Sequence, residues 1–328
     1  MGEQLASNEV LRSWRDGATR QAIIDFIERV SDRGTDPIPL VQRIAVFDND
    51  GTLWTEKPMP TQLHFIVQQW AAAAAADPSL ADRQPYTAAV TKDFAWLGAA
   101  IDKHYGGDDA DLRTIIAALL TLTVGMSVED YEEAVRLFYE QARHLTLGRP
   151  YSAVIYQPMV ELLRFLEAHG FTCYIVSGGD RDFMRPMTAA NYGIPPERVV
   201  GSAVGLTYEH GEVRYSSTFS FMDDGPEKPV RIWSRIGRRP VFAVGNSDGD
   251  IPMLKYVQKH PLSMSILIHH DDDTGRGDIP YDKGAEAALA DPQSNGFTVV
   301  SVKNDWSTVF PAVDSLHSAP SESTTPST

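Results

Sequence analysis

Cysteine and positive charge are both scarce in this chain. The single cysteine, Cys173, excludes an intrachain disulfide and any metal site built from several thiolates. It lies in the apolar run 171–176, which predicts a small buried side chain and not a reactive thiol. The formal net charge is -15 at pH 7 because acidic residues (44) outnumber basic ones (29). This balance argues against nucleic acid and anionic membranes as partners, and an anionic ligand would need a local positive site.

The sequence also lacks a long apolar run and a secretory start. The closest run, residues 115–126, contains threonine and falls short of the roughly 18 apolar residues of a membrane-spanning helix. The beginning, M-G-E-Q-L-A-S-N-E-V, has neither the basic start nor the apolar centre of a signal peptide. We therefore expect a cytoplasmic protein without a membrane partner, while a longer precursor could still be exported. The 328 residues allow one large domain or two ordinary ones.

The sequence does contain a strand followed at once by two acids. Residues 44–55 read I-A-V-F-D-N-D-G-T-L-W-T, and the apolar run 44–47 predicts a strand buried on both faces of a parallel sheet. Asp48 and Asp50 follow directly, and a glycine then permits a sharp turn that the Thr52 hydroxyl can hold. Ligands gather outside the carboxyl ends of such strands, so we expect chemistry here. Taken alone, the stretch could also be a solvated turn.

Later stretches bring polar groups to strand ends in the same way. Residues 171–180, F-T-C-Y-I-V-S-G-G-D, predict a strand that runs into Ser177 and Gly178, whose hydroxyl and amide can cradle an oxyanion. The strand predicted at 240–245 leads to a second polar group, Asn246, Asp248 and Asp250. Between them, Lys228 precedes a predicted helix. Each signal is short, so a plain loop, a helix-capping turn and a surface lysine remain alternatives for each taken alone.

Taken in order, these stretches resemble the motifs of the haloacid dehalogenase-like (HAD) hydrolase superfamily in its phosphatase form, D-x-D-G-T. The resemblance extends from about residue 43 to about residue 306, and the phosphoserine phosphatase group is the nearest. It implies an α/β fold, a Rossmann-like doubly wound parallel sheet, with a helical C1-type cap inserted after the first strand. The implied core is 1–55 and 151–311, and the cap is 56–150. The Ser-, Thr- and Pro-rich remainder, 312–328, predicts a disordered tail.

Local patterns agree with this division. The alanine run 71–76 and apolar spacings such as 112–119 predict helices throughout 56–150, where strand patterns are almost absent. Glu56 and Lys57 are candidates for contacts near the entrance of the cap. Outside the cap, the patterns predict helices at 23–30, 159–169 and 283–289, a hairpin at 201–221 with Gly211 in its turn, and strands at 264–268 and 297–302.

The resemblance also implies a role for each motif residue. Asp48 would be the nucleophile, and Asp50 the general acid and base. The phosphate group would be held by Thr52, Ser177, Gly178 and Lys228. The Mg2+ ligands would be Asp48, Asp50, Asn246 and Asp250. Asn246 departs from the superfamily, which usually has a metal-binding aspartate there. An amide oxygen can bind a hard cation but brings no charge, so the division of labour among Asn246, Asp248 and Asp250 is open.

These roles predict a Mg2+-dependent phosphatase that hydrolyses a small soluble phosphomonoester through an aspartyl-phosphate intermediate. A dehalogenase would not need Asp50. A phosphotransferase and a non-catalytic protein that binds a phosphorylated ligand remain alternatives, and the substrate and the oligomeric state are open. The acid-rich stretch 269–278, H-H-D-D-D-T-G-R-G-D, matches no known pattern of metal ligands, so we expect a solvated loop there.

Overall fold

The computed structural model of the chain describes residues 10–105 and 107–312, so the predicted tail lies outside the described residues from 313 on. Within these ranges the strands form one 7-stranded sheet in the order β4-β3-β2-β1-β5-β6-β7. The strands are β1 (Ile44–Phe47), β2 (Thr172–Asp180), β3 (Val199–Glu209), β4 (Glu212–Phe221), β5 (Phe242–Gly245), β6 (Met264–His269) and β7 (Thr298–Ser301). Neighbouring strands pair in parallel, apart from the antiparallel pair of β3 and β4.

Strand β1 lies in the middle of this sheet, between β2 and β5. All of its residues are buried, as the continuous apolar run predicts for a strand covered on both faces. Phe47 is aligned with Ile175 of β2 and with Val244 of β5. The three strands therefore end near one another, and the polar residues that follow β1 and β5, Asp48 and Asn246, begin from neighbouring positions.

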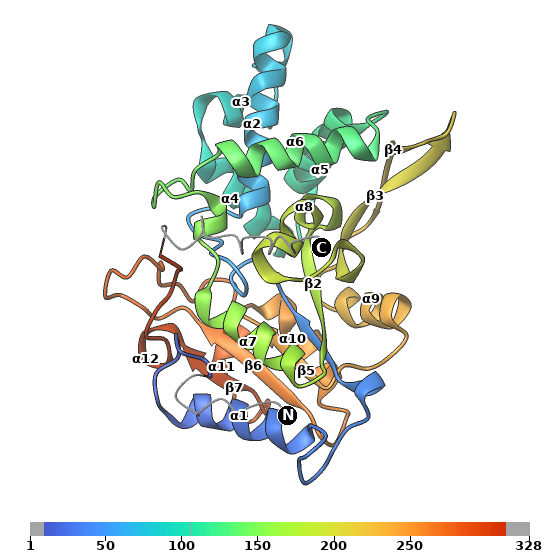
Figure 1. Ribbon diagram of the computed structural model, residues 1–328. Coiled ribbons are helices and arrows are strands. Elements are labelled where there is room, and N and C mark those ends of the chain that lie inside the picture. Colours follow the sequence, from blue (N-terminus) through green and yellow to red (C-terminus); the bar gives the residue numbers. More distant parts are fainter. Residues whose placement is uncertain (1–9, 106, 313–328) are drawn as a thin grey trace, which may run out of the picture.

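Helices cover both faces of the sheet (Figure 1). They are α1 (Ala18–Val30), α7 (Gln157–Ala168), α8 (Arg181–Tyr192), α9 (Glu227–Ile236), α10 (Ile251–Val257), α11 (Glu286–Ala290) and α12 (Val302–Asp305). Successive residues of β1 point to opposite faces. Phe47 belongs to the apolar cluster that includes α1 and α7, and Val46 to the cluster that includes α9 and α10. The predicted doubly wound α/β sheet is therefore confirmed.

The segment after β1 is helical, as its sequence predicts. It contains α2 (Thr61–Ala76), α3 (Tyr86–Thr91), α4 (Phe94–Tyr105), α5 (Ala110–Thr123) and α6 (Val128–Gln141). These helices gather at one end of the sheet, and the long β3-β4 ribbon extends beside them (Figure 1). Phe65 of α2 and Tyr139 of α6 pack on Phe183 of α8, with ring centroids 5.4 and 5.2 Å apart. That residues 56–150 form a separate cap domain stays a prediction.

Most predicted element boundaries agree with the structure to within a few residues. Gly211 has a φ of +94° in the turn of the β3-β4 hairpin. The helix predicted at 283–289 begins later, at Glu286, because the Asp248 carboxylate accepts hydrogen bonds from the backbone N–H groups of Ala287 and Ala288 and so fixes the first turn of α11. Among the described residues, no helix is both long enough and apolar enough to cross a membrane.

The first testable prediction concerns the core beneath β1. The Phe242 side chain is fully buried and packs on Phe26 and Phe47, with ring centroids 6.0 and 6.2 Å apart. We expect Phe242→Ala to lower the free energy of unfolding by about 3–5 kcal/mol, because it removes apolar contacts and leaves a cavity. Urea unfolding measures the loss. The control is Tyr208→Ala, at a side chain that is 76% exposed. Equal losses in both variants would contradict the assigned core.

Candidate active site

A buried lysine joins three parts of the chain at the ends of the strands. Lys228, in the first turn of α9, places its Nζ 2.7 Å from Asp48 Oδ1 and 2.6 Å from Asp250 Oδ1. All three side chains are nearly or fully buried. Burial opposes the charge of Lys228, but the carboxylates of Asp250 and Asp48 outweigh it and hold the pKa of the lysine well above its usual value. The structure thus brings together the predicted nucleophile and the predicted phosphate-binding lysine.

This buried ion triad contains two carboxylates but one ammonium group. Burial, and then the charge of Asp250, raises the pKa of Asp48 well above its usual value, against the opposing effect of Lys228. Asp48 Oδ1 is held by the lysine, whereas Oδ2 receives no hydrogen bond from the described residues. The site is short of positive charge, and one oxygen of Asp48 is oriented and available.

Asp250 is fully occupied by hydrogen bonds from the protein. Its Oδ2 accepts from the backbone N–H groups of Asn246 (2.9 Å) and Ser247 (3.0 Å) and from the Ser247 hydroxyl (3.1 Å), while Oδ1 accepts from Lys228. These bonds fix the loop after β5 and aim the carboxylate at the lysine. Asp248 instead caps α11 through its bonds to Ala287 and Ala288. A metal-binding role for Asp250 stays a prediction.

Asn246 contacts the turn that follows the first strand. Its Oδ1 accepts a hydrogen bond from the Thr52 hydroxyl (3.1 Å), and its Nδ2 donates to the Tyr281 hydroxyl (3.0 Å) and to Glu56 Oε1 (3.4 Å). Gly51 has a φ of +71°, and a Cβ atom there would lie 2.2 Å from Asn246 Nδ2. The turn therefore requires glycine both for its backbone conformation and for the close approach of Asn246. Thr52 is fully buried and positions Asn246, and its predicted phosphate contact stays a prediction.

Asp50 has the electrostatic environment of a proton donor. Its Oδ1 accepts a hydrogen bond from Trp54 Nε1 at 2.8 Å. Burial and the nearby charge of Glu56 raise the pKa of Asp50 to about 6, against the smaller effects of that hydrogen bond and of Lys228. A carboxyl group with such a pKa can both give and take a proton near neutral pH.

The S-G-G stretch lies beside this acid. The buried Ser177 hydroxyl accepts a hydrogen bond from the Gly179 N–H (3.1 Å), and the Gly178 carbonyl accepts one from the Ser202 hydroxyl (2.7 Å). A Cβ atom on Gly179 would lie 3.5 Å from Asp50 Oδ2, which shows how closely the second stretch approaches the first. The contact of Ser177 and Gly178 with phosphate stays a prediction.

Gln62, in the first turn of α2, brings the helical segment into contact with the S-G-G stretch. Its Oε1 accepts a hydrogen bond from the backbone N–H of Asp180 at 2.8 Å and lies 3.4 Å from the position of a Cβ on Gly179. A second contact joins the Tyr131 hydroxyl of α6 to Asp180 Oδ2 at 3.2 Å. Sequence reasoning did not single out Gln62, because neither its residue type nor its spacing marks it as functional.

The acid-rich loop after β6 is not simply solvated. Within the described residues no group of three or more His, Cys, Asp or Glu side chains could hold a metal ion. His270 is buried and donates from Nε2 to the Gly51 carbonyl (2.7 Å) and from Nδ1 to Asp278 Oδ2 (2.8 Å). Burial lowers the pKa of His270, but the nearby charge of Asp278 outweighs it and raises this pKa above its usual value. The His270 ring stacks on Tyr281 at 4.7 Å and ties the Gly51 turn to the loop.

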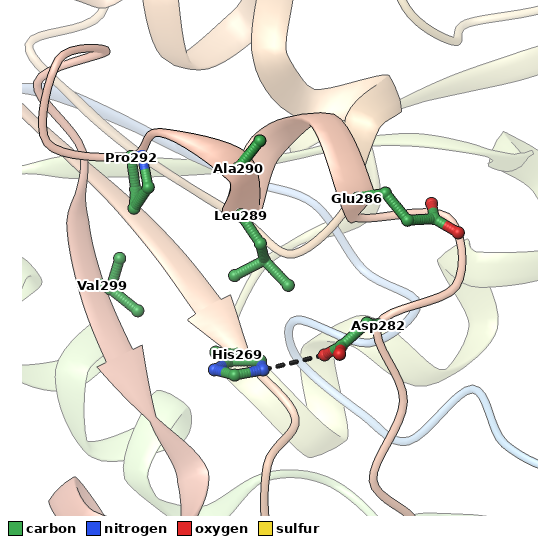
Figure 2. A pocket seen from close by; sticks show the side chains of 7 residues that line it. All are labelled: His269, Asp282, Glu286, Leu289, Ala290, Pro292 and Val299. Carbon is green, nitrogen blue, oxygen red and sulfur yellow. Dashed lines mark hydrogen bonds and ion pairs between the residues drawn. The ribbon is translucent and has the colours of Figure 1, made fainter.

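A separate pocket lies at the edge of the sheet. It is lined by His269, Asp282, Glu286, Leu289, Ala290, Pro292 and Val299. Figure 2 shows these side chains around α11, with His269 at the end of β6 and Val299 on β7. His269 is paired with Asp282 at 2.9 Å. None of the lining residues belongs to the predicted site, which lies at the ends of β1, β2 and β5.

The ion triad makes a prediction about stability. Lys228→Met leaves two buried carboxylates without their cation, and we expect a loss of about 3–5 kcal/mol in the free energy of unfolding at pH 7. Without the lysine, the folded-state pKa of Asp48, which burial already raises, rises further above that of the unfolded chain. The stabilisation from holding this proton is complete at low pH and is lost as the pH rises. The deficit relative to the wild type should therefore grow between pH 5 and 8.

Chemical unfolding in EDTA across this pH range measures the deficit. The matched control is Lys255→Met, because Lys255 is an exposed lysine on α10. A Lys228→Met deficit that stays constant with pH would contradict the account of the triad.

Comparison with known proteins gives the family. The sequence model of the haloacid dehalogenase-like hydrolases matches residues 45–255. No curated protein matches the chain in sequence. Among solved structures, a conserved protein of unknown function from Anaerococcus prevotii DSM 20548 is similar with a TM-score of 0.54 and 15% identity, over 88% of this chain and 94% of that chain.

Two further structures extend the comparison. A protein of unknown function from Bordetella pertussis Tohama I is similar with a TM-score of 0.50 and 17% identity, over 79% of this chain and 98% of that chain. A phosphoserine phosphohydrolase-like protein from Francisella tularensis subsp. tularensis SCHU S4 is similar with a TM-score of 0.37 and 14% identity, over 71% of this chain and 90% of that chain.

The family match covers the aspartates after β1, the S-G-G stretch, the buried lysine and the loop after β5, which are the segments that the structure brings together. It spans residues 45–255, well over half of the chain, and the prediction made from the motifs is confirmed. The chain belongs to the haloacid dehalogenase-like hydrolases.

Proposed function

We propose that this hydrolase is a Mg2+-dependent phosphatase that cleaves a small soluble phosphomonoester through an aspartyl-phosphate on Asp48. The observation that carries the proposal is the asymmetry of the Asp48 carboxylate. One oxygen is held 2.7 Å from Lys228, and the other receives no hydrogen bond from the described residues. A carboxylate fixed in this way can present a single oxygen for in-line attack on phosphorus.

The chemistry proceeds in two displacements. In the first, Asp48 Oδ2 attacks phosphorus, the bond from phosphorus to the ester oxygen breaks, and Asp50 gives its proton to the departing alcohol. In the second, Asp50 takes a proton from water, the water oxygen attacks the phosphorus, and phosphate leaves with Asp48 restored. The pKa of Asp50, raised to about 6 by burial, suits both transfers. The Lys228 ammonium stabilises the equatorial oxygens in both steps.

The residues at the site fit a hard divalent cation. The ion triad is short of positive charge, and the available donors are all oxygens, as Mg2+ prefers. Asp48, the main-chain oxygen of Asp50 and Asn246 Oδ1 would hold the ion, since an amide oxygen that accepts from Thr52 keeps a second lone pair. Asp250 would act through Lys228. When bound, Mg2+ supplies charge neutralisation for the phosphoryl group.

The helical segment supports a small substrate. Gln62 of α2 accepts a hydrogen bond from the backbone N–H of Asp180, and the Tyr131 hydroxyl of α6 contacts the Asp180 side chain. These two helices therefore lie directly beside the end of β2. A covered site of this kind admits a small phosphate ester more readily than a folded protein. Transfer of the phosphoryl group to another acceptor would use the same Asp48 chemistry and differs in the second step alone.

The test of the proposal is phosphate release from p-nitrophenyl phosphate. We expect activity with Mg2+, none in EDTA, and none in Asp48→Asn, because an amide cannot form the intermediate. Asp248→Asn serves as the control, since Asp248 caps α11 and should leave activity within about 3-fold. Trapping of radiolabelled phosphate on the wild type and not on Asp48→Asn checks the intermediate. An inactive wild type that still binds phosphate esters would favour the non-catalytic binding protein.

The proton donor generates a prediction about pH. Asp50 must be protonated in the first step, so kcat/KM for a poorly leaving alkyl phosphate should fall as the pH rises above about 6. The nitrophenolate group of p-nitrophenyl phosphate leaves with little need for protonation. For this ester kcat/KM should therefore fall less over the same pH range. Asp50→Asn should lower kcat/KM for the alkyl ester by about 10²–10⁴-fold and flatten the profile. Identical profiles for the two esters in the wild type would argue against this role.

A further inference from the structure

Asn246 is a neutral ligand in the proposed cation site, so its position brings no charge to the cation. The superfamily motif places an aspartate at this position, and the amide that stands here supplies an oxygen ligand alone. A hard cation is held mainly by charge, so a neutral substitution should weaken the site unless a carboxylate from elsewhere replaces it. The side chains packed on Asn246 show where such a carboxylate lies.

Glu56 is an acidic side chain that contacts the side-chain amide of Asn246, whereas Asp250 is bonded to the Asn246 backbone N–H. Glu56 Oε1 lies 3.4 Å from Asn246 Nδ2, and the Glu56 side chain is 18% exposed. It belongs to the segment that leads from β1 to α2, directly after the turn that carries the first two aspartates. Glu56 is thus brought to the loop after β5 by the same chain segment that supplies Asp48 and Asp50.

Neighbouring groups hold Glu56 in this place. Lys57 Nζ lies 3.5 Å from Glu56 Oε1 and 4.1 Å from the centroid of the Tyr281 ring. The Tyr281 hydroxyl in turn accepts the hydrogen bond from Asn246. Glu56 is therefore held between Lys57 and the Asn246 amide, beside the loop after β5.

The contact explains why position 246 carries an amide. An aspartate here would place a carboxylate oxygen about where Nδ2 lies, 3.4 Å from Glu56 Oε1. Two carboxylates this close repel, and one of them would take up a proton. An amide removes the repulsion and donates a hydrogen bond to Glu56 instead. Asn246 and Glu56 are therefore complementary, with the charge on residue 56.

We infer that Glu56 supplies the carboxylate charge that Asn246 lacks, so that the Mg2+ site of this chain draws this acidic charge from residue 56 and not from residue 246. The inference rests on the proposed function, since it concerns the cation that the proposed reaction uses. It assigns Glu56 to binding of the cation and leaves attack and proton transfer to Asp48 and Asp50.

The test is a double-mutant cycle read by calorimetric titration of the EDTA-stripped protein with Mg2+. We expect Glu56→Gln to weaken Mg2+ binding by about 10–100-fold, as loss of a supporting group around a metal site typically does. Adding Asn246→Asp to Glu56→Gln should restore most of the affinity, because it returns a carboxylate to the same corner. In the wild-type background, Asn246→Asp should tighten binding much less, because its charge is opposed by that of Glu56.

Two controls accompany the cycle. Glu197→Gln removes the same charge from an exposed position and should leave Mg2+ binding unchanged. Glu56→Ala tests whether any defect comes from the lost carboxylate and not from the new amide. Thermal unfolding in EDTA shows whether each variant is folded.

The outcomes separate the inference from the proposed function. If the wild type binds Mg2+ and Glu56→Gln binds it equally well, the inference is wrong and the phosphatase proposal stands. If Asn246→Asp has the same effect in both backgrounds, the two residues do not share one charge, and the inference is again wrong. If the wild type binds no Mg2+, both the metal requirement and the inference are overturned.

Discussion

The candidate site depends on one buried cation held between two buried carboxylates. Lys228 lies between Asp48 and Asp250, and none of the three could remain charged in the interior without the others. Asp48 follows β1, Asp250 lies in the loop after β5, and Lys228 lies in the first turn of α9. The ion triad can therefore form only if β1 and β5 are adjacent and in parallel register. The strand order that places β1 beside β5 is therefore also the condition for pairing the buried charges.

The same arrangement of strands explains which of these residues the sequence could be expected to bring together. Apolar runs that end in polar residues occur at β1, β2 and β5, and parallel strands bring their carboxyl ends to one edge. Asp48, Ser177 and Asn246 could therefore be placed together from the sequence with the help of the motif order. Lys228 does not directly follow a strand, and its position was predicted from the order of the motifs alone.

Contacts that depend on side-chain packing could not be predicted in this way. Gln62 and Tyr281 reach the site from segments whose residue types and spacing mark no function. The position of His270 at a strand end could have been used to predict its role. It directly follows β6, the next strand beyond β5, yet the acids around it suggested a solvated loop, whereas the histidine is buried and holds the Gly51 carbonyl. The acidic composition of this stretch indicates exposure for most of its residues, but it gives no sign that His270 is buried.

Asn246 shows a different limit of motif reading. A motif assigns a charge to a position, but a cation responds to the charge in the surrounding space and not to the residue number that carries it. The turn at Gly51 brings residue 56 back against the loop after β5, so a carboxylate on either segment can occupy nearly the same corner. A neutral residue at a motif position is therefore weak grounds for inferring a lost activity until the acids that face it have been identified.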